Sequence, residues 1–413
     1  MSPESGPVVI VGAGHGGSTL AALLRQAGFD GPVVMIGSEP HLPYHRPPLS
    51  KKFGDPGFQQ PIRPPDFYAD NDIEVRTGAS VTALDRSSQT VRLSTGERLG
   101  YAHLVLATGS SPRRLAVRGS DAAGVLTLRT IEDAAALGRS LEARGTLAII
   151  GGGYVGMEVA AVARSHDVPV TVVERENRIL ARVASPDLSQ RLTDYHRARG
   201  TDIRVDATVT EVRQQGGWAT AVDLADGSTI AADTVLVGIG AIPDDALAHQ
   251  AGLACDGGVL VDWCGRTSDP SVFAIGDVAR RPINDTGDLV RLESIPNVTD
   301  QAKQVVAALT GRPQPEPEVP WFWSDQFDIK LKIAGLVRPG ARIVPRPGKK
   351  PGSFALYHLG ADETVHAVEA ANAPSDFIAG KKFIAQRTPV SPGALGDPSV
   401  SLHEVTAATP VGS

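Results

Sequence analysis

One glycine-rich pattern occurs twice in this chain, and it restricts the fold more than any other feature. The first copy runs from Val8 to Gly17 and the second from Leu147 to Gly156. Each is a short β-branched or aliphatic run followed by Gly-x-Gly-x-x-Gly and then by an alanine-rich helical pattern. A strand, a tight turn and a helix in this order are typical of a dinucleotide-binding site.

Each glycine of the pattern has a physical role. The first allows the tight turn, the second lets a pyrophosphate approach the backbone, and the third lets the helix pack closely on the strand. The pyrophosphate then accepts hydrogen bonds at the helix N-terminus, where the helix dipole also favours negative charge. The sequence therefore predicts two dinucleotide sites in one chain, built on Gly12, Gly14, Gly17, Gly151, Gly153 and Gly156.

A carboxylate at the end of the next strand indicates which dinucleotide each site prefers. Glu174 follows the strand Val170–Val173, about 20 residues beyond the second pattern. A carboxylate there accepts hydrogen bonds from a ribose diol and repels a 2′-phosphate, so we expect NADH rather than NADPH. Arg175 comes next and could weaken that preference. Glu39 is the corresponding ribose ligand of the first site, unless it is only a surface carboxylate at a strand end.

Two further strand ends carry small residues or an aspartate. The strand that ends at Leu106 is followed by Ala107, Thr108 and Gly109, and the strand Val272–Ile275 is followed by Gly276 and Asp277. An aspartate at such a turn can accept a hydrogen bond from a flavin ribitol hydroxyl, although Gly-Asp alone is an ordinary turn. Asp277 is therefore a candidate cofactor ligand.

Composition narrows the class of protein. The 413 residues, 42% of them hydrophobic, suggest two to three domains, and the net charge of −6 argues against nucleic acid as a partner. No stretch is long and apolar enough for a transmembrane helix, and the N-terminus passes directly into the first strand. We therefore expect a cytoplasmic protein without a membrane partner.

The two cysteines argue against thiol chemistry. Cys255 and Cys264 do not form a C-x-x-C or C-x-x-x-x-C pair, so the sequence predicts neither a redox-active dithiol nor a metal site. A flavoprotein disulfide reductase is not expected. An NADH oxidase or peroxidase would need a reactive cysteine near the flavin, and neither cysteine lies in the glycine patterns.

Several longer motifs carry a family resemblance. The segment Pro43–Lys51 reads Pro-Tyr-His-Arg-Pro-Pro-Leu-Ser-Lys and resembles the flavin loop of the oxygenase-coupled NADH:ferredoxin reductases, FAD enzymes of the glutathione-reductase structural type. The similarity extends along nearly the whole chain. It includes the second glycine pattern and the segments Ala107–Gly109, Phe273–Asp277, Arg291–Ser294, Pro320–Phe327 and Asp376–Lys382.

The resemblance implies roles for particular residues. Arg46 and Lys51 would approach the flavin, and Lys51 would pair with Glu158 beside flavin N5, which makes Lys51 and Glu158 the catalytic candidates. Trp323 would pack against the flavin. The alternatives are a solvated Lys51 with Glu158 facing water, and a Trp323 that only fills the core.

The chain departs from the family pattern at two places, Ile295 to Val298 and His15. Ile295 to Val298 read Ile-Pro-Asn-Val where many relatives carry an aromatic residue and then Asn-Ala. We keep Ile295 among the cofactor-binding residues and expect a different environment at the adenine or flavin edge. His15 occupies a position of the first pattern usually filled by a small or amide residue. His45 lies inside the flavin loop, and neither histidine is assigned a catalytic role.

The resemblance also implies an architecture of the α/β class. We expect two Rossmann-like domains that bind FAD and NAD, plus a small α+β C-terminal domain. Residues 1–110 and 241–324 would form the FAD domain, 111–240 an inserted NAD domain and 325–413 the C-terminal domain. In the C-terminal part, alternation in Ile329–Ile333 and Ser353–Leu359 predicts an antiparallel sheet, with a helix from Ala373 onward.

A function follows from the resemblance. It implies hydride transfer from NADH to FAD and delivery of single electrons to a [2Fe-2S] ferredoxin that serves a P450 or Rieske-type oxygenase. A rubredoxin reductase and a signalling flavoprotein similar to apoptosis-inducing factor stay open as alternatives.

Seven basic residues lie between Ile329 and Ala361, and no Asp or Glu interrupts them. They could form a docking face for an acidic ferredoxin. Alternatively, they belong to a solvated hairpin whose Lys and Arg side chains protect its edge strand from pairing with other chains. They are Lys330, Lys332, Arg338, Arg342, Arg346, Lys349 and Lys350.

Overall fold

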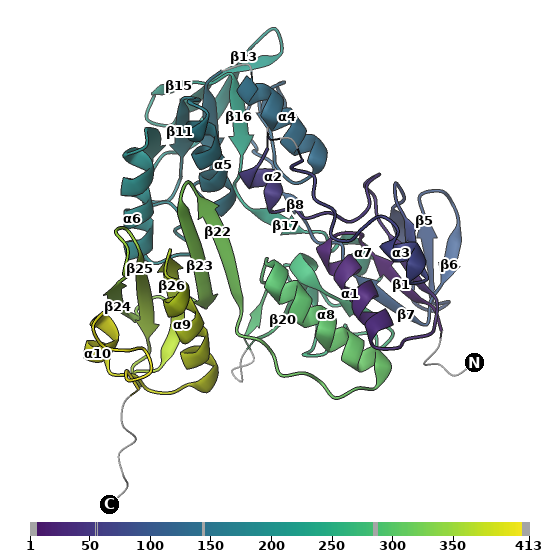
Figure 1. The fold of residues 1–413 in the computed structure, drawn as a ribbon. Coiled ribbons are helices and arrows are strands. Elements are labelled where there is room, and N and C mark those ends of the chain that lie inside the picture. Colours follow the sequence, from purple (N-terminus) through teal and green to yellow (C-terminus); the bar gives the residue numbers. More distant parts are fainter. Residues whose placement is uncertain (1–5, 54, 56, 143–144, 284–287, 407–413) are drawn as a thin grey trace, which may run out of the picture. The chain divides into compact units, whose positions relative to one another are not determined.

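The chain forms two compact units, each assembled from separated segments. The computed structural model describes residues 6–53, 55, 57–142, 145–283 and 288–406 (Figure 1). Unit 1 comprises residues 1–46, 59–111 and 241–318, and unit 2 comprises 47–58, 112–240 and 319–413.

Unit 1 is built on a five-stranded parallel sheet with the order β19-β7-β1-β2-β3. Its strands are nearly continuous apolar runs because both faces of a parallel sheet are buried. The helices α1 and α8 pack on each other against this sheet, and α8 contributes Val305 and Leu309 to the core. The strands are β1 (Val8–Val11), β2 (Val33–Ile36), β3 (Ile73–Arg76), β7 (His103–Leu106) and β19 (Val272–Ala274); the helices are α1 (His15–Gln26) and α8 (Ile295–Thr310).

Smaller elements complete unit 1. They include an antiparallel sheet β4-β5-β6, a sheet β18-β20-β21, the β17–β8 pair at the unit boundary, and short helices. Their bounds are α3 (Phe67–Asp70), β4 (Val81–Asp85), β5 (Thr90–Leu93), β6 (Arg98–Gly100), β8 (Ser110–Pro112), β17 (Ala241–Pro243), α7 (Ala246–Gln250), β18 (Val259–Leu260), η2 (Gly276–Val278), β20 (Ala279–Pro282) and β21 (Leu289–Val290).

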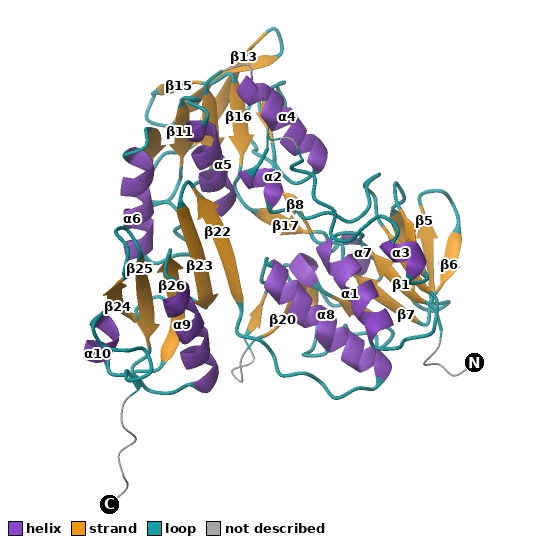
Figure 2. Ribbon diagram, in the orientation of Figure 1, coloured by secondary structure: helices purple, strands orange, loops and turns teal. Residues whose placement is uncertain are grey.

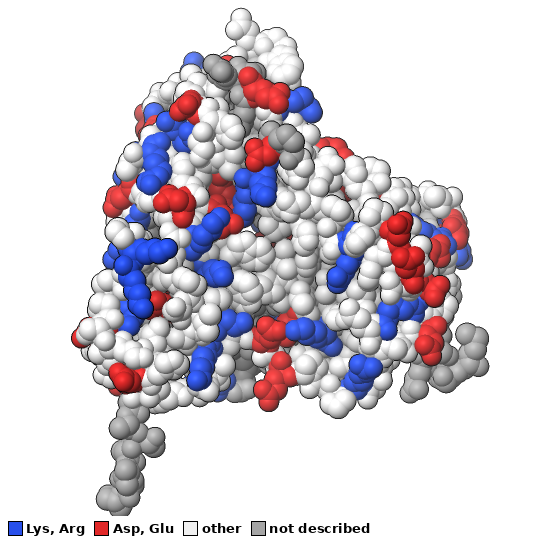
Figure 3. Space-filling view, in the orientation of Figure 1, with Lys and Arg blue, Asp and Glu red and all other residues white. Residues whose placement is uncertain are grey.

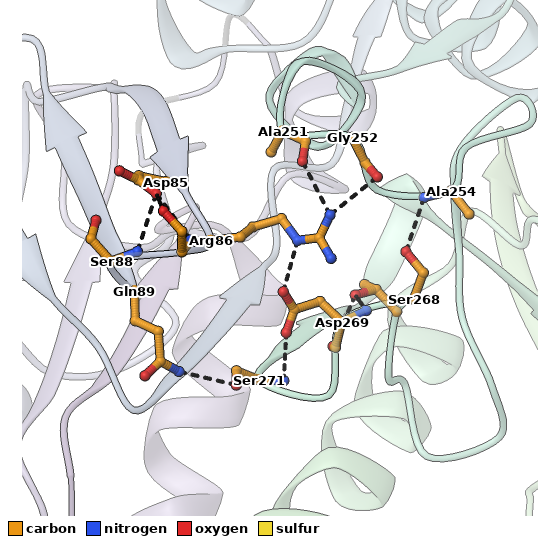
Figure 4. Close-up of polar contacts among 12 residues, drawn as sticks. Asp85, Arg86, Ser88, Gln89, Ala251, Gly252, Ala254, Ser268, Asp269 and Ser271 are labelled. Carbon is orange, nitrogen blue, oxygen red and sulfur yellow. Dashed lines mark hydrogen bonds and ion pairs between the residues drawn. The ribbon is translucent and has the colours of Figure 1, made fainter.

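A single arginine connects three of these parts. Arg86, just after β4, pairs with Asp269 at 2.7 Å and donates to the carbonyls of Ala251 and Gly252 after α7 (Figure 4). The contact joins the β4–β5 hairpin to the end of α7 and to the loop that leads into β19. It is structural, because the partners of the guanidinium are one side chain and two backbone carbonyls of the fold.

Unit 2 repeats the plan of unit 1. Its parallel sheet has the order β12-β11-β10-β16-β9, with β10 in the central position that β1 holds in unit 1. An antiparallel sheet β13-β14-β15 and three long helices accompany it. The bounds are α2 (Pro48–Lys51), β9 (Val125–Leu126), α4 (Ile131–Glu142), β10 (Leu147–Ile150), α5 (Tyr154–Ser165), β11 (Val170–Val173), α6 (Pro186–Arg197), β12 (Thr201–Arg204), β13 (Val209–Gln215), β14 (Trp218–Leu224), β15 (Thr229–Ala231) and β16 (Thr234–Val237).

Unit 2 also contains a C-terminal antiparallel sheet with the order β22-β23-β26-β25-β24. Helix α9 covers β23 and β26, as Figure 2 shows. In β23 the buried Ile329, Leu331 and Ile333 alternate with Lys330 and Lys332, so the predicted antiparallel strand is confirmed. The bounds are β22 (Trp321–Gln326), β23 (Ile329–Gly335), β24 (Arg342–Pro347), β25 (Phe354–Leu359), β26 (Val365–Ala371), α9 (Pro374–Gln386) and α10 (Pro392–Gly396).

The α/β class with two Rossmann-like sheets and an α+β C-terminal part is therefore as expected. The compact units are not the predicted domains, since unit 2 joins most of 111–240 to 325–413 and takes in residues 47–58 of the flavin loop. The boundaries at 110, 240 and 324 stay a prediction. Within the described residues no helix has the length and hydropathy needed to cross a membrane.

Candidate functional site

The first glycine pattern forms a turn that only glycine can complete. Gly12 has φ +120°, and a Cβ there would lie 2.1 Å from the carbonyl oxygen of Ala107. A Cβ on Gly17 would lie 2.0 Å from the carbonyl oxygen of Gly12, so the third glycine is needed for α1 to pack on the turn. Gly14 differs, because no atom lies within 4 Å of its would-be Cβ. Open space therefore borders the first turn of α1.

The second pattern has the same geometry in unit 2. Gly151 has φ +108° and its would-be Cβ lies 2.4 Å from the carbonyl oxygen of Gly238, and Gly156 packs equally closely on Gly151. Gly153 caps α5 as Gly14 caps α1, and its would-be Cβ also meets open space. Neither cap residue has a side chain to satisfy the free helical N–H groups, so both turns can offer them to an anion.

Glu39 and Arg46 form an ion pair in unit 1. Arg46 donates to Glu39 Oε1 at 2.6 Å, and the Tyr44 hydroxyl donates to Glu39 Oε2 at 2.5 Å. The resemblance implied that Arg46 approaches the flavin, whereas here its guanidinium lies on the carboxylate expected to bind ribose. Arg46 and Glu39, both predicted to bind the cofactor, therefore contact each other directly.

The ends of strands β7 and β19 come together at the carboxyl edge of the unit 1 sheet. Ser110 donates to Asp277 Oδ2 at 3.0 Å, and the Thr108 hydroxyl donates to the carbonyl of Asp244 at 2.8 Å. Gly109 adopts φ +75° in this turn. In open α/β sheets ligands bind outside the carboxyl ends of the strands, and Ala107, Thr108, Gly109 and Asp277 all lie there.

Ile295 is the first residue of α8. Ser294 caps the helix by accepting from the backbone N–H of Asn297, and Pro296 lies in the first turn. A proline there removes no hydrogen bond, because the first N–H groups of a helix have no intrahelical partner. The departure from the family pattern therefore leaves the helix start intact.

Two histidines and an arginine gather beside the N-terminus of α1. The rings of His15 and His45 lie 5.5 Å apart, centroid to centroid. Burial, together with the positive fields of His45 and Arg63, lowers the pKa of His15 to about 4, and burial beside Arg63 lowers the pKa of His45 as well. His15 Nδ1 and Arg63 Nε are buried without a partner among the described residues. A guanidinium N–H and a neutral imidazole that can donate from Nδ1 suit a phosphate.

The Lys51–Glu158 pair lies in unit 2. Lys51 Nζ is 2.7 Å from Glu158 Oε1, with the two side chains 16% and 5% exposed. The structure therefore brings the two catalytic candidates together and excludes the alternative in which both face water. The Ser50 hydroxyl donates to Glu158 Oε2 at 2.5 Å and the Ser324 hydroxyl to Oε1 at 2.7 Å.

Tyr154 of the second pattern lies near the same carboxylate. Burial raises the pKa of its phenol well above the usual value, and the negative charges of Glu369 and Glu158 add to the effect. Its ring packs edge-on against Phe322 with centroids 4.7 Å apart. Tyr154 therefore stays neutral and contributes an apolar wall beside Glu158.

Glu174 is held by the turn of the second glycine pattern. Its Oε2 accepts from the backbone N–H of Gly152 at 2.7 Å, and its Oε1 accepts from that of Glu176 at 2.8 Å. Arg175 pairs with Glu176 at 3.0 Å. The carboxylate is thus fixed at the end of β11 beside the turn, as a ribose ligand needs to be.

Trp323 is a half-buried residue of β22 in unit 2, with its ring centroid 5.8 Å from that of Trp321. Lys51, Glu158 and Trp323 belong to unit 2, and the residues from Gly12 to Arg46, Ala107 to Gly109, Asp277 and Ile295 belong to unit 1.

The cysteines are free and poorly nucleophilic. Burial, then the nearby carboxylates of Asp245 and Asp262, raises the pKa values of Cys255 and Cys264. Less thiolate forms at neutral pH as a result, and the thiolate is the reactive species.

The basic stretch of the C-terminal sheet is not a uniform face. Arg346 is buried, pairs with Asp376 at 3.2 Å and donates to the carbonyls of Leu395 and Val400. Lys330 pairs with Asp325 at 3.2 Å. On the part of unit 2 visible in Figure 3, basic and acidic side chains alternate. Arg338, Arg342, Lys349 and Lys350 stay exposed at or near the edge strand β24, and their role in docking stays a prediction.

Sequence reasoning predicted Lys51 as a partner of Glu158 but missed its two hydroxyl partners. Ser50 and Ser324 lay within the quoted motifs, but neither residue was singled out. A signal was available for one of them. In a strand, Ser324 and Gln326 share one face, and two buried polar residues on one face require partners.

Comparison with known proteins decides the family. Residues 6–304 match the model of the pyridine nucleotide-disulphide oxidoreductases, and residues 321–406 match the reductase C-terminal domain. A probable ferredoxin reductase from Castellaniella defragrans is 41% identical over 404 residues, covering 97% of this chain and 98% of the relative. Putidaredoxin reductase from Pseudomonas putida is 41% identical over 410 residues, covering 97% of both chains. The chain belongs to the ferredoxin reductases of this family.

Solved structures agree with the assignment to this reductase family. The ferredoxin reductase for the CYP199A2 system of Rhodopseudomonas palustris gives a TM-score of 0.93 at 38% identity and covers 97% of this chain and 100% of its own. The covalent putidaredoxin reductase–putidaredoxin complex gives a TM-score of 0.93 at 40% identity, covering 97% and 98%.

Membership makes FAD and NADH the cofactors, and the residues present fit them. Each glycine turn leaves open space beside a helix N-terminus without a side-chain cap. At the first turn the unpartnered His15 Nδ1 and Arg63 Nε supply further groups for a phosphate. At the second turn, Glu174 is fixed by the Gly152 N–H, where a carboxylate would suit a ribose diol.

Proposed function

We propose that this chain is an NADH:ferredoxin oxidoreductase that transfers electrons to a [2Fe-2S] ferredoxin and, through it, to a P450 or Rieske-type oxygenase. The observation that carries the proposal is the repeated glycine turn, which gives one chain two dinucleotide cradles of equal geometry. FAD, when bound, supplies the chemistry that accepts two electrons as hydride from NADH and releases them one at a time.

The residues of unit 1 hold FAD in this proposal. The backbone around Gly12, Gly14 and Gly17 binds the pyrophosphate, and Glu39 binds the adenosine ribose. Ala107 to Gly109, Asp277 and Ile295 complete the contacts at the carboxyl edge of the sheet. Arg46 orients Glu39 through their 2.6 Å ion pair.

The residues of unit 2 hold NADH and tune the flavin. The turn of Gly151, Gly153 and Gly156 binds the pyrophosphate of NADH, and Glu174 binds its ribose. Lys51 supplies a fixed positive charge toward the flavin, while Glu158 holds that ammonium in place. Trp323 offers the flavin a flat apolar surface and shields it from oxygen.

The proposal requires no general base, nucleophile or resident metal, because the protein only orients the groups and sets their electrostatics. It also places the enzyme in the cytoplasm. Both cysteines are free, which suits a reducing compartment.

Steady-state assays with alternative donors and acceptors test this function. The purified holoprotein should reduce [2Fe-2S] ferredoxins with NADH at a higher kcat/KM than with NADPH, and should reduce rubredoxin and oxygen more slowly. A higher kcat/KM with rubredoxin than with the ferredoxins would support the alternative function, a rubredoxin reductase. Failure to reduce any carrier protein would contradict the proposal and favour a signalling flavoprotein.

A further inference from the structure

A line of buried side chains joins the Lys51–Glu158 pair to helix α6, all within unit 2. The Ser324 hydroxyl lies 2.7 Å from Glu158 Oε1, Gln326 Nε2 lies 3.1 Å from Ser324 Oγ, and His196 Nε2 lies 2.9 Å from Gln326 Oε1. Ser324, Gln326 and His196 are fully buried, and Glu158 is 4% exposed. We call Ser324, Gln326 and His196 the polar chain.

The carboxylate at one end determines the direction of every hydrogen bond in the polar chain. An ionised Glu158 only accepts, so Ser324 must donate to it and must therefore accept from Gln326. The amide nitrogen of Gln326 then faces Ser324, and its oxygen faces His196. His196 must in turn carry its proton on Nε2.

His196 has the properties that this direction requires. Burial lowers its pKa to about 4, so the ring is neutral and one nitrogen must lack a proton. Its Nδ1 is buried without a partner among the described residues. An unpaired buried nitrogen is unfavourable, and an apolar side chain would pack there without that cost. The bond to Gln326 accounts for the histidine better than packing does.

Two elements hold the polar chain in place. Alternation in β22 directs Ser324 and Gln326 to the same face. Helix α6 is attached to the C-terminal sheet at both ends, because His196 bonds Gln326 and the N-cap Ser185 donates to Glu369 of β26 at 2.5 Å. The donor and acceptor positions are therefore set by rigid elements rather than by loops.

We propose that Ser324, Gln326 and His196 are positioning residues, which hold the Glu158 carboxylate in one orientation and thereby direct the Lys51 ammonium. This inference rests on the proposed role of the Lys51–Glu158 pair at the flavin. A buried carboxylate that accepts from two hydroxyls and an ammonium has few other orientations available. Without the Ser324 hydroxyl, Oε1 keeps the Lys51 ammonium but loses the neutral donor that fixes its direction. The carboxylate can then turn, and the ammonium turns with it.

Histidine NMR on the ¹⁵N-histidine-labelled holoprotein tests the direction of the polar chain without any activity measurement. His196 should show a protonated Nε2 and an unprotonated Nδ1 at neutral pH. Substituting Glu158→Gln replaces the accepting carboxylate by an amide that can also donate, so the opposite tautomer of His196 should become populated. A protonated Nδ1 in the unsubstituted protein would overturn the proposal.

Rapid-reaction kinetics test the positioning role. Ser324→Ala should lower the limiting rate of flavin reduction by NADH by about tenfold, the effect of losing one hydrogen bond to a charged group. Gln326→Met removes the donor that orients the Ser324 hydroxyl and should lower the same rate by a smaller factor. The NADH dissociation constant from the same titration should change less, because the polar chain does not touch the glycine turn. Gln304→Met is the matched control, since Gln304 is equally buried but bonds to Pro315 in unit 1.

A double substitution separates the two possible failures. If the polar chain acts through Glu158, Gln326→Met should have no further effect in a Glu158→Gln background. Slow reduction in Glu158→Gln with normal rates in Ser324→Ala and Gln326→Met would overturn this inference and leave the proposed function standing. Normal reduction in Glu158→Gln would contradict the proposed role of the pair itself and, with it, this inference.

Discussion

At the scale of single residues, burial makes the Lys51–Glu158 ion pair sensitive to the loss of either partner. Removing one member of a buried pair leaves an uncompensated charge, whereas removing both can be nearly neutral. Lys51→Met should therefore lower the free energy of unfolding by about 3 kcal/mol, the lower end for breaking a buried pair, because Lys51 is partly exposed. The double variant Lys51→Met with Glu158→Gln should recover at least half of that loss. Urea unfolding of the unsubstituted protein, Lys51→Met and the double variant measures both losses. Equal losses in the single and the double variant would show that an unpaired Glu158 carries no free-energy penalty.

Glu174 governs the choice between the two nicotinamide cofactors. Glu174→Gln keeps an oxygen that can accept from the Gly152 N–H but removes the charge that repels a 2′-phosphate. The ratio of kcat/KM for NADH to that for NADPH should fall by about tenfold, mainly through a gain with NADPH. Thr171→Val, on the strand that leads to Glu174, serves as a control that leaves the carboxylate in place. An unchanged ratio in Glu174→Gln would assign the preference to another residue.

At the scale of elements, Gly14 and Gly153 separate folding from cofactor binding. A Cβ at either position meets no protein atom within 4 Å and neither residue has positive φ, so alanine should fold normally. The same Cβ would occupy the space that we assign to a pyrophosphate. Gly14→Ala should weaken FAD binding by at least about tenfold, and Gly153→Ala should keep FAD but raise the KM for NADH by a similar factor. Normal binding of both cofactors in both variants would contradict the assignment of the cradles.

The same elements show what could be predicted from sequence. The Gly12 and Gly151 turns were predictable, because local backbone geometry alone demands glycine there. Two strands of the C-terminal sheet, β23 and β25, were also predicted from alternation, although β25 is buried along almost its whole length. The hydrogen-bond and ion-pair partners of the charged side chains were not predictable, because they depend on tertiary contacts. Arg46 lies on Glu39 at 2.6 Å, and Arg346 of the basic stretch is buried against carbonyls of distant loops.

The polar chain shows the limit most clearly. Ser324 and Gln326 lie on one face of a predicted strand, but nothing in the sequence connects that face to His196, which lies 130 residues from Gln326. The predicted boundaries place His196 in 111–240 and both Ser324 and Gln326 outside it, whereas the structure groups all three residues in one compact unit. Contacts across a predicted boundary are the part of the site that sequence patterns do not reveal.

At the scale of the whole molecule, buried histidines make stability depend on pH. The folded-state pKa values of His15 and His196 are about 4, against 6.5 for an unperturbed histidine. Between these values the unfolded chain binds more protons than the folded one, so their contribution is complete above pH 6.5 and is lost as the pH falls toward 4. His15→Asn should reduce the loss of unfolding free energy between pH 7 and pH 5 by on the order of 1 kcal/mol in the cofactor-free protein. His403→Asn, at an exposed position, should leave this loss of unfolding free energy unchanged. The same pH dependence in His15→Asn as in the unsubstituted protein would contradict the account.

The most direct test of the central claim is anaerobic stopped-flow mixing of the holoprotein, first with NADH and then with a [2Fe-2S] ferredoxin. The claim is that one chain accepts hydride from NADH and passes single electrons to an iron–sulfur protein. Rapid flavin bleaching with NADH, slower bleaching with NADPH, and prompt reoxidation by ferredoxin with reduction of its cluster are the predicted result. A flavin that reduces slowly, or that stays reduced in a long-lived complex with the nicotinamide when ferredoxin is added, would contradict it.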